Sequence, residues 1–445
     1  MNYNLNTLIK RTIKVLSQNK EISDYSLNIN KKSTTEMFYV LQKLETSRIT
    51  DTFEILITIY KKNGENLGQA SFMISHDINK KQIEELINQA LYSASFVNNK
   101  YYDIVKGEKK IKKIKKIDKV LSVTPFEFLE KTANEFFNAS FENESESIKF
   151  NSLELFFINN NVRMINSKGV NYEKETNEIM IEAIPSFTSF KTNYKTELYR
   201  MYRYNDVNDK LIERIKKAAK EAVEDCKLRS EAVSLNEVIK DDEKIVDVVL
   251  RDEDISNMLD EIISSYDYHS VYTESNMHKV GDMVQKDDSK NKITVKLEKI
   301  SKEDFFDGEG VLLDDVTIID KGKLVSYYGG NRFASYLGLK PTGSLPVIHL
   351  GKGNKSFDKI EKKNEKWIEV IDMSGIQVDL YQGYIGGEVR LAKYYDGKEI
   401  KAVSGFSFSG NLVDALNSIE LSKEEIAIRF YRGPKYAKIK NMELN

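Results

Sequence analysis

Residues 305–328 read FFDGEGVLLDDVTIIDKGKLVSYY and contain the clearest local fold signal in the chain. Two apolar-rich runs, Val316–Asp320 and Lys323–Tyr328, are separated by Lys321-Gly322. Glycine adopts positive φ at no steric cost, so this spacing predicts a β-hairpin. The stretch therefore indicates β-structure in this part of the chain.

The pattern continues on both sides of this hairpin. Residues 389–403 predict a second hairpin around Asp396-Gly397, residues 244–250 predict a strand, and apolar positions in 255–263 follow one face of a helix. Many short strands separated by glycines are typical of a sandwich or a partly closed barrel. We expect residues 230–445 to form a β-rich C-terminal domain.

The N-terminal part predicts a layered α+β domain over residues 1–105. Residues 5–16 carry apolar side chains at helical spacing, and so do residues 83–91. Between them, alternating isoleucines in 55–59 and the Asn63-Gly64 turn predict a hairpin. Helices packed on a small sheet give such a domain its core.

The middle part, residues 124–229, predicts a second α+β domain. Thr124-Pro125 is typical of a helix start. Residues 153–158 and 162–165 predict a hairpin that turns at Asn159–Asn161, and residues 211–226 predict a long helix. The fold class is therefore α+β throughout, with the β-rich domain last.

A lysine-rich segment, residues 106–123, lies between these two units. We interpret it as a solvated linker, because no aromatic residue interleaves the lysines as it does in single-strand nucleic-acid binders. The chain carries 67 Lys and Arg against 69 Asp and Glu, a net charge of −2. That balance argues against a dedicated nucleic-acid binder.

Composition excludes other classes. Apolar residues make up 40% of the 445 residues, enough for a core, so the chain is not a disordered protein. No apolar run approaches the length of about 18 residues that a membrane helix needs, and the first residues do not resemble a signal peptide. With Cys226 as its one cysteine, the chain has no intrachain disulfide, and we expect a cytoplasmic protein.

The sequence contains no complete set of catalytic residues in a known motif. The chain has four histidines, and His269, Glu274 and His278 are the only candidates for a metal site. We interpret His349 as a structural residue in a strand and Cys226 as a packed core thiol. Serine-nucleophile, phosphate-loop and dinucleotide motifs are absent. No catalytic, cofactor-binding or metal-binding residue is therefore assigned, and no cofactor is expected.

Several stretches together resemble the TldD/PmbA family, also described as modulators of DNA gyrase. The strongest are Phe305–Val311 and Asp315–Leu324, which are similar to the family block Asp-Asp-Glu-Gly-Val-Pro … Ile-Glu-x-Gly-x-Leu. Shorter stretches agree with further family elements: Asn166–Gly169, Asn331–Gly338, Pro341–Gly343, Ser374-Gly375 and Ser404–Leu412. The sequence departs from the family at Leu312-Leu313, where an acidic-proline hinge is usual, and in its short lysine-rich tail.

The resemblance implies two kinds of member. TldD-type chains are zinc peptidases with a His-Glu-x-x-x-His helix, whereas PmbA-type (TldE) chains lack those ligands. Counting back from Val280–Asp282 places the metal-bearing stretch on Asn257–Ile262. Asn257 and Ile262 then occupy the histidine positions and Met258 the glutamate position, and no two histidines lie five apart anywhere. The chain therefore resembles the PmbA/TldE type.

From this resemblance we expect a non-catalytic subunit of a TldD/TldE-type metallopeptidase complex that acts on peptides or unfolded segments. Its expected partner is a TldD-like zinc chain in a heterodimer, or a second copy in a homodimer, with no membrane contact. Two alternatives stay open. One is an autonomous metal-dependent peptidase that uses His269, Glu274 and His278. The other is a non-enzymatic homodimeric binding protein, with nucleic acid as a partner only through residues 106–119.

Overall fold

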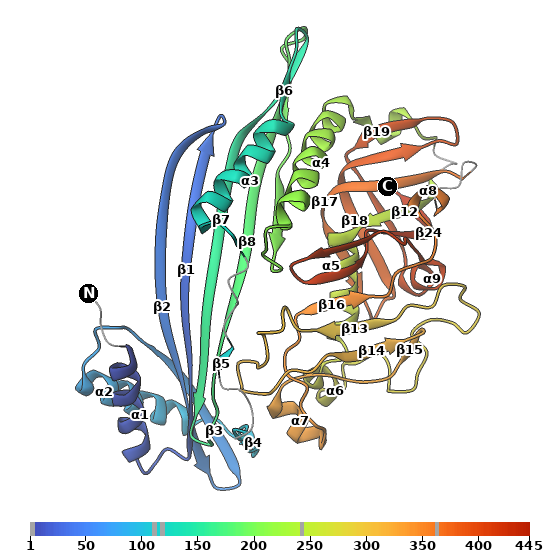
Figure 1. Ribbon diagram of the computed structural model, residues 1–445. Helices are drawn as coiled ribbons and strands as arrows, with labels where there is room; N and C mark the ends of the chain where they lie inside the picture. The colour runs from blue at the N-terminus through green and yellow to red at the C-terminus, as the bar shows by residue number, and fades with distance from the viewer. Residues whose placement is uncertain (1–4, 109–113, 116–120, 241–243, 361–364) are drawn as a thin grey trace.

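The computed structural model describes residues 5–108, 114–115, 121–240, 244–360 and 365–445. These residues form a long curved sheet on one side and a β-rich region of two further sheets on the other, as Figure 1 shows. The expected α+β class with a barrel-like β-rich C-terminal part is confirmed. Within the described residues, no helix combines the length and apolar character that crossing a membrane requires.

The long sheet runs in the order β10-β8-β7-β1-β2-β3-β4 and joins the N-terminal and middle parts of the chain. Its strands are β1 (Asp24–Val40), β2 (Lys43–Asn63), β3 (Asn66–Ile74), β4 (Asn99–Lys100), β7 (Glu146–Asn166), β8 (Asn171–Ser189) and β10 (Arg200–Tyr204). Three short strands lie off this path: β5 (Ile114–Lys115), β6 (Phe141–Glu142) and β9 (Lys195–Glu197). Because β1 pairs with β7 along its length, the two parts share one sheet.

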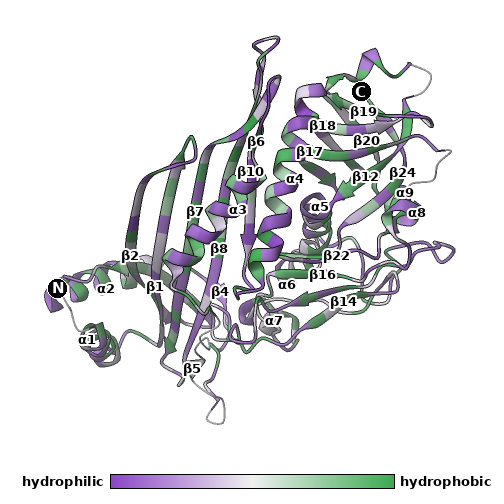
Figure 2. Ribbon diagram, turned by 45° about the horizontal axis from the view of Figure 1, so that its top comes forward, coloured by the Kyte–Doolittle hydropathy of each residue, from purple (hydrophilic) through white to green (hydrophobic). Residues whose placement is uncertain are grey.

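Four helices cover parts of this sheet and supply two apolar cores. They are α1 (Leu5–Gln18), α2 (Lys80–Ala94), α3 (Pro125–Ala139) and α4 (Leu211–Glu231). The expected start of α3 is confirmed, since Thr124 and Glu127 form a reciprocal capping box ahead of Pro125. Hydrophilic and hydrophobic residues both occur along the long strands, as expected for a sheet with one better-covered face (Figure 2).

One expected hairpin is wrong. Residues 153–165 do not turn at Asn159–Asn161, because β7 runs unbroken through them and pairs with β8. Asn159 donates to Glu175 Oε1 (2.9 Å) and Asn177 Oδ1 (2.8 Å), both on β8. Asparagine favours turns when its side chain bonds to its own backbone, but here the neighbouring strand satisfies it.

The C-terminal part contains two sheets. The first has the order β11-β19-β18-β17-β12-β24-β20, and β20 also pairs with β18, which closes a barrel-like ring. Its strands are β11 (Val233–Ser234), β12 (Ile245–Arg251), β17 (Trp367–Asp379), β18 (Tyr384–Tyr395), β19 (Ile400–Ser404), β20 (Phe406–Asn411) and β24 (Tyr436–Leu444), with β21 (Glu420–Leu421) beside β24. The second has the order β15-β14-β13-β16-β23-β22. Its strands are β13 (Val295–Glu298), β14 (Val316–Asp320), β15 (Lys323–Leu324), β16 (Val347–Leu350), β22 (Glu425–Ile428) and β23 (Tyr431–Pro434).

One continuous apolar core joins these two sheets and includes helix α5 (Asp252–Ser264). The remaining short helices are η1 (Leu235–Glu237), α6 (Tyr268–Tyr272), α7 (Asn331–Leu337), α8 (Phe357–Ile360) and α9 (Leu412–Ser418). Both expected hairpins, β14–β15 and β18–β19, are confirmed. Of the expected linker, residues 109–113 and 116–120 lie outside the described residues.

Candidate functional site

Several of the family-like stretches meet around one cleft at the junction of the long sheet and the C-terminal part. The cleft has a volume of about 960 Å³. We call it the motif cleft, and it is lined by residues 103–106, Glu108, Lys168, Lys299, Phe305, residues 310–314, Asn331, Lys340 and Pro341. Stretches that lie far apart in the sequence therefore share one location in the fold.

Asp307 organises the loop that forms one wall of the motif cleft. Its Oδ1 accepts hydrogen bonds from the backbone N–H groups of Glu309 and Val311, both at 2.9 Å, and its Oδ2 accepts one from Ser344 at 3.3 Å. Burial raises the pKa of this carboxyl, and the three backbone donors oppose that shift. In this position Asp307 holds a tight turn together, which is a structural role.

The same loop joins the C-terminal part to the long sheet. Lys174 of β8 forms an ion pair with Asp304 and donates to the Phe306 carbonyl. On the other side, Asn331 at the start of α7 donates its side-chain amide to the Asp103 carbonyl (2.7 Å). The Asn331 backbone N–H donates to Glu309 Oε2 at 2.6 Å. The family-like residues thus maintain the junction around the cleft.

The expected metal-bearing stretch lies on α5, and its residues do not fit a zinc ion. Met258 is 0% exposed and Ile262 is 2% exposed, and both point into the core. Asn257 is exposed on the opposite side. Zinc takes imidazole, thiolate or carboxylate ligands and, in catalytic sites, keeps one open position. A thioether and an aliphatic side chain packed in a core supply neither the ligands nor the open position.

The histidine candidates are not brought together. His278 Nδ1 lies 2.8 Å from the Tyr266 hydroxyl, and burial lowers the pKa of His278, opposed by Asp282. The His269 ring instead packs edge-on against Phe333, with 4.8 Å between ring centroids. Over all described residues, no group of three or more His, Cys, Asp or Glu side chains has a geometry that could hold a metal ion.

His349 and Cys226 both occupy positions in which their side chains contribute to packing and hydrogen bonding. His349 Nδ1 lies 2.6 Å from Glu298 Oε1, and Arg432 binds the other oxygen of Glu298 at 2.7 Å. Burial raises the pKa of Glu298, but the hydrogen bonds and charges of His349 and Arg432 outweigh it and lower that pKa overall. Cys226 is buried on α4, and burial raises the pKa of its thiol to about 11, which disfavours the reactive thiolate.

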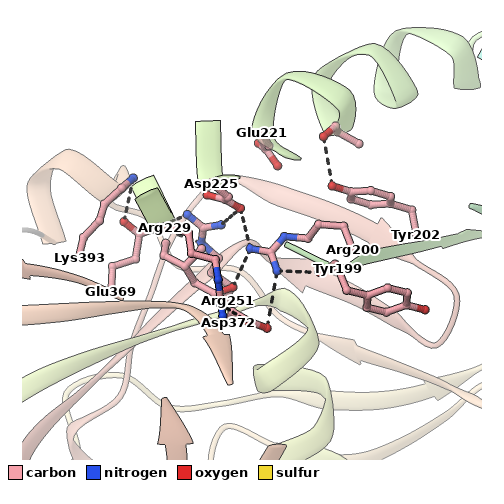
Figure 3. A network of polar contacts seen from close by, with 12 residues as sticks. Tyr199, Arg200, Tyr202, Glu221, Asp225, Arg229, Arg251, Glu369, Asp372 and Lys393 are labelled. Carbon is pink, nitrogen blue, oxygen red and sulfur yellow. Dashed lines mark hydrogen bonds and ion pairs between the residues drawn. The ribbon is translucent and has the colours of Figure 1, made fainter. Parts of the chain in front are cut away.

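A charged network that the sequence did not predict connects α4 and β10 to the barrel-like sheet (Figure 3). Asp225 of α4 binds Arg200 of β10 (2.9 Å) and Arg251 of β12 (3.3 Å). We call it the junction network, and its members are Arg200, Asp225, Arg229, Arg251, Glu369, Asp372 and Lys393.

The network continues into the barrel-like sheet. Glu369 of β17 accepts from Arg251 through two nitrogens, at 2.9 and 2.7 Å, and pairs with Lys393 at 3.5 Å. Both Arg251 nitrogens donate to the same oxygen, Glu369 Oε1, and hydrogen bonds between charged groups of this kind are stronger than neutral ones. No local periodicity marks these residues, because each charge finds its partners through long-range packing.

Next to this network, the first turn of α5 carries three consecutive acidic residues, Asp252, Glu253 and Asp254. Burial first, and then Glu253 and Asp252, raise the pKa of Asp254 to about 8. Burial also raises the pKa of Asp260 further along the helix. The run of three acids was visible in the sequence, but the partial burial of Asp252 and Asp254 was not. Of these acids, Asp254 is the one whose raised pKa lies near neutral pH.

Both the sequence and the fold are similar to those of known proteins. Residues 243–444 match the family model of the PmbA/TldA metallopeptidase C-terminal domain. No functionally curated protein matches the sequence.

Solved structures resemble the whole chain. TldE from Thermococcus kodakarensis has a TM-score of 0.76 and 16% identity, covering 99% of both chains. A protein of Thermotoga maritima proposed to modulate DNA gyrase has a TM-score of 0.76 and 14% identity, covering 99% of this chain and 100% of that one. Its counterpart from Bacteroides thetaiotaomicron has a TM-score of 0.75 and 16% identity, covering 100% of this chain and 99% of the other.

At these identities the structural likeness establishes the fold, and the family match covers the C-terminal part, which contains α5 and one side of the motif cleft. Residues 243–444 are thus similar to the PmbA/TldA metallopeptidase C-terminal domain, within a whole-chain fold that resembles the fold of TldE.

Proposed function

We propose that this chain is a TldE/PmbA-type subunit of a TldD/TldE-type metallopeptidase, with a TldD-like chain supplying the zinc. One observation carries the proposal. The helix at which the family resemblance places the zinc motif directs Met258 and Ile262 into an apolar core. A helix built this way stabilises the domain and leaves metal chemistry to a partner.

In such a complex this chain contributes wall and peptide-holding surface. The exposed face of α5, with Asn257, Asp260 and Glu261, is the part we expect to face the peptide, because it lies on the same helix as the motif position. Carboxylates there favour peptides with basic side chains. The substrate is therefore expected to be an extended, basic peptide or unfolded segment.

The first experiment tests the partnership. A TldD-like chain with an intact His-Glu-x-x-x-His motif, encoded in the same genome, is co-expressed with the tagged chain and purified at low and moderate salt. Co-purification, with peptidase activity that needs both chains, is the expected result. Failure of the two chains to associate under any of these conditions, or full activity of the TldD-like chain alone, would refute the proposal.

The second experiment tests the surface. D260K and E261K are expected to lower cleavage of a lysine-rich reporter peptide while the complex still assembles. The control is D414K, because Asp414 is an exposed acid on a different helix, α9. Equal activity of all three variants would remove α5 from substrate contact.

The alternative of an autonomous metallopeptidase has its own test. Untagged protein is loaded with zinc, dialysed and analysed for metal content and peptidase activity. One firmly bound zinc that is lost in the variant H278A would favour this alternative, because His278 is the more buried of the two candidate histidines. We expect substoichiometric zinc and no activity from the chain alone.

A further inference from the structure

A small cavity lies between α4 and the barrel-like sheet, beside the junction network. It has a volume of about 260 Å³. Asp225 of α4, Arg251 of β12 and Glu369 of β17 form part of its wall (Figure 3). Small-molecule sites often lie where two structural units meet, so this cavity is a candidate binding site.

Aromatic and aliphatic side chains make up much of the remaining wall. The ring of Phe357 stacks on the ring of Tyr436, with 4.0 Å between the ring centroids and 16° between the planes. Trp367 is only 3% exposed, and Leu228 and Ile400 add aliphatic groups to the wall. An occupant with an apolar group would therefore bury that group against this part of the wall.

The cations of the wall are already paired with acids of the same chain. Arg251 pairs with Glu369 at 2.7 Å, and Lys393 pairs with the same carboxylate at 3.5 Å. Lys435 forms an ion pair with Glu221. Because each of these cations has its own acidic partner, the cavity is not built to attract an anion from solution.

One acid of the wall is left over for an occupant. Glu224 on α4 is exposed, and no cation in the described parts of the chain forms an ion pair with it. Hydrogen bonds between a carboxylate and a positively charged donor are stronger than neutral ones. The free carboxylate therefore favours an occupant that carries an ammonium group.

Trp367 offers the complementary hydrogen-bonding group. Its Nε1 is buried and, within the part of the chain that the structure describes, donates to no acceptor. Buried donors in folded proteins nearly always have a partner. Because the indole of Trp367 lines the cavity, an occupant with a carbonyl or carboxylate oxygen beside the ring would supply the missing acceptor.

We propose that this cavity binds an apolar residue with a free α-amino group, either as a single amino acid or as the N-terminal residue of a short peptide. Its ammonium group donates to the Glu224 carboxylate, its carbonyl oxygen accepts from Trp367 Nε1, and its side chain packs against the apolar wall. The volume of about 260 Å³ lies just below the range of about 300–1,000 Å³ for typical small-molecule pockets, which fits an occupant of this size. The inference does not depend on the peptidase proposal.

The first test is a fluorescence titration of the full chain. Trp367 is the only tryptophan, so its emission reports on this cavity. L-leucine is expected to give a saturable change, and N-acetyl-leucine, which lacks the ammonium group, is expected to bind at least about tenfold more weakly. Tighter binding of the tripeptide Leu-Gly-Gly than of L-leucine would identify a peptide N-terminus as the occupant, and the reverse order a free amino acid. No saturable change with either compound, or equal affinity for N-acetyl-leucine, overturns the proposal.

The second test removes the two recognition groups one at a time and measures L-leucine binding by calorimetry. E224Q removes the free charge, and W367F keeps an aromatic ring but removes the N–H donor. Both are expected to weaken binding by about tenfold. The control is E213Q, because Glu213 is also exposed on α4 but does not line the cavity. Circular dichroism confirms that each variant is folded. Unchanged affinity in E224Q or in W367F, or an equal loss in E213Q, contradicts the proposal.

Discussion

Removal of the Asp225 carboxylate tests whether the junction network connects α4 to the barrel-like sheet. Asp225 accepts from Arg200 at 2.9 Å and from Arg251 at 3.3 Å. All three side chains are largely buried, with 9%, 14% and 17% of their surface exposed. The variant D225A leaves two buried guanidinium groups without this partner.

The expected cost follows from these contacts. A hydrogen bond to a charged group contributes about 1.5–3 kcal/mol, and breaking a buried ion pair from one side costs about 3–5 kcal/mol. Arg251 keeps Glu369 at 2.7 Å and Arg200 keeps Asp372 at 3.6 Å, so neither cation is left alone. We therefore expect D225A to lower the free energy of unfolding by about 3 kcal/mol, at the lower end of that range.

The assay is urea unfolding followed by tryptophan fluorescence. Trp367 is the only tryptophan, and it lines a small cavity together with Asp225 and Arg251. The control is E425A, which removes the exposed pair between Glu425 and Lys352 and should cost less than about 1 kcal/mol. A loss in D225A no larger than in E425A would contradict this prediction, because the network would then be as weak as a surface ion pair.

Three further predictions concern single residues. Burial and two acidic neighbours raise the pKa of Asp254 to about 8. Between pH about 4 and 8 the folded chain therefore keeps a proton on Asp254 that the unfolded chain has released. For this reason the free energy of unfolding falls as the pH rises through that range. D254N should therefore raise the melting temperature at pH 8.5 and change it little at pH 4; a constant difference would contradict this. D307A removes three hydrogen bonds from backbone N–H groups and should lower the free energy of unfolding by about 3 kcal/mol. Amide hydrogen exchange should become faster only in the loop that Asp307 holds, and unchanged exchange there would count against this role. G353A places a methyl group 1.7 Å from the Leu421 carbonyl oxygen and should lower the midpoint of urea unfolding. The control G308A places its methyl group in open space and should leave that midpoint unchanged. Equal midpoints for the two variants would show that the backbone near Gly353 moves at little cost.

Sequence patterns predicted the elements whose signals are local. Helical spacing located α1, α2 and α5, and the capping residue Thr124 located the start of α3. The Lys321-Gly322 turn located the β14–β15 hairpin, because Gly322 adopts positive φ at no steric cost. Each of these features depends on neighbours within a few positions.

Patterns failed where distant partners override local preference. Asn159 lies within an unbroken strand because Glu175 and Asn177 of β8 satisfy its side chain. The junction network likewise joins residues up to 172 positions apart (372 − 200), as in the ion pair of Arg200 with Asp372. Such partners come together only when the sheets have assembled.

Residue identity alone shows that Met258 and Ile262 provide no imidazole ligand, since no folding can create one. The burial of those side chains in a core, and the meeting of scattered family-like stretches around one cleft, became evident only in the folded chain. Chemical identity belongs to each residue, whereas burial and proximity depend on contacts between residues that are far apart in the sequence.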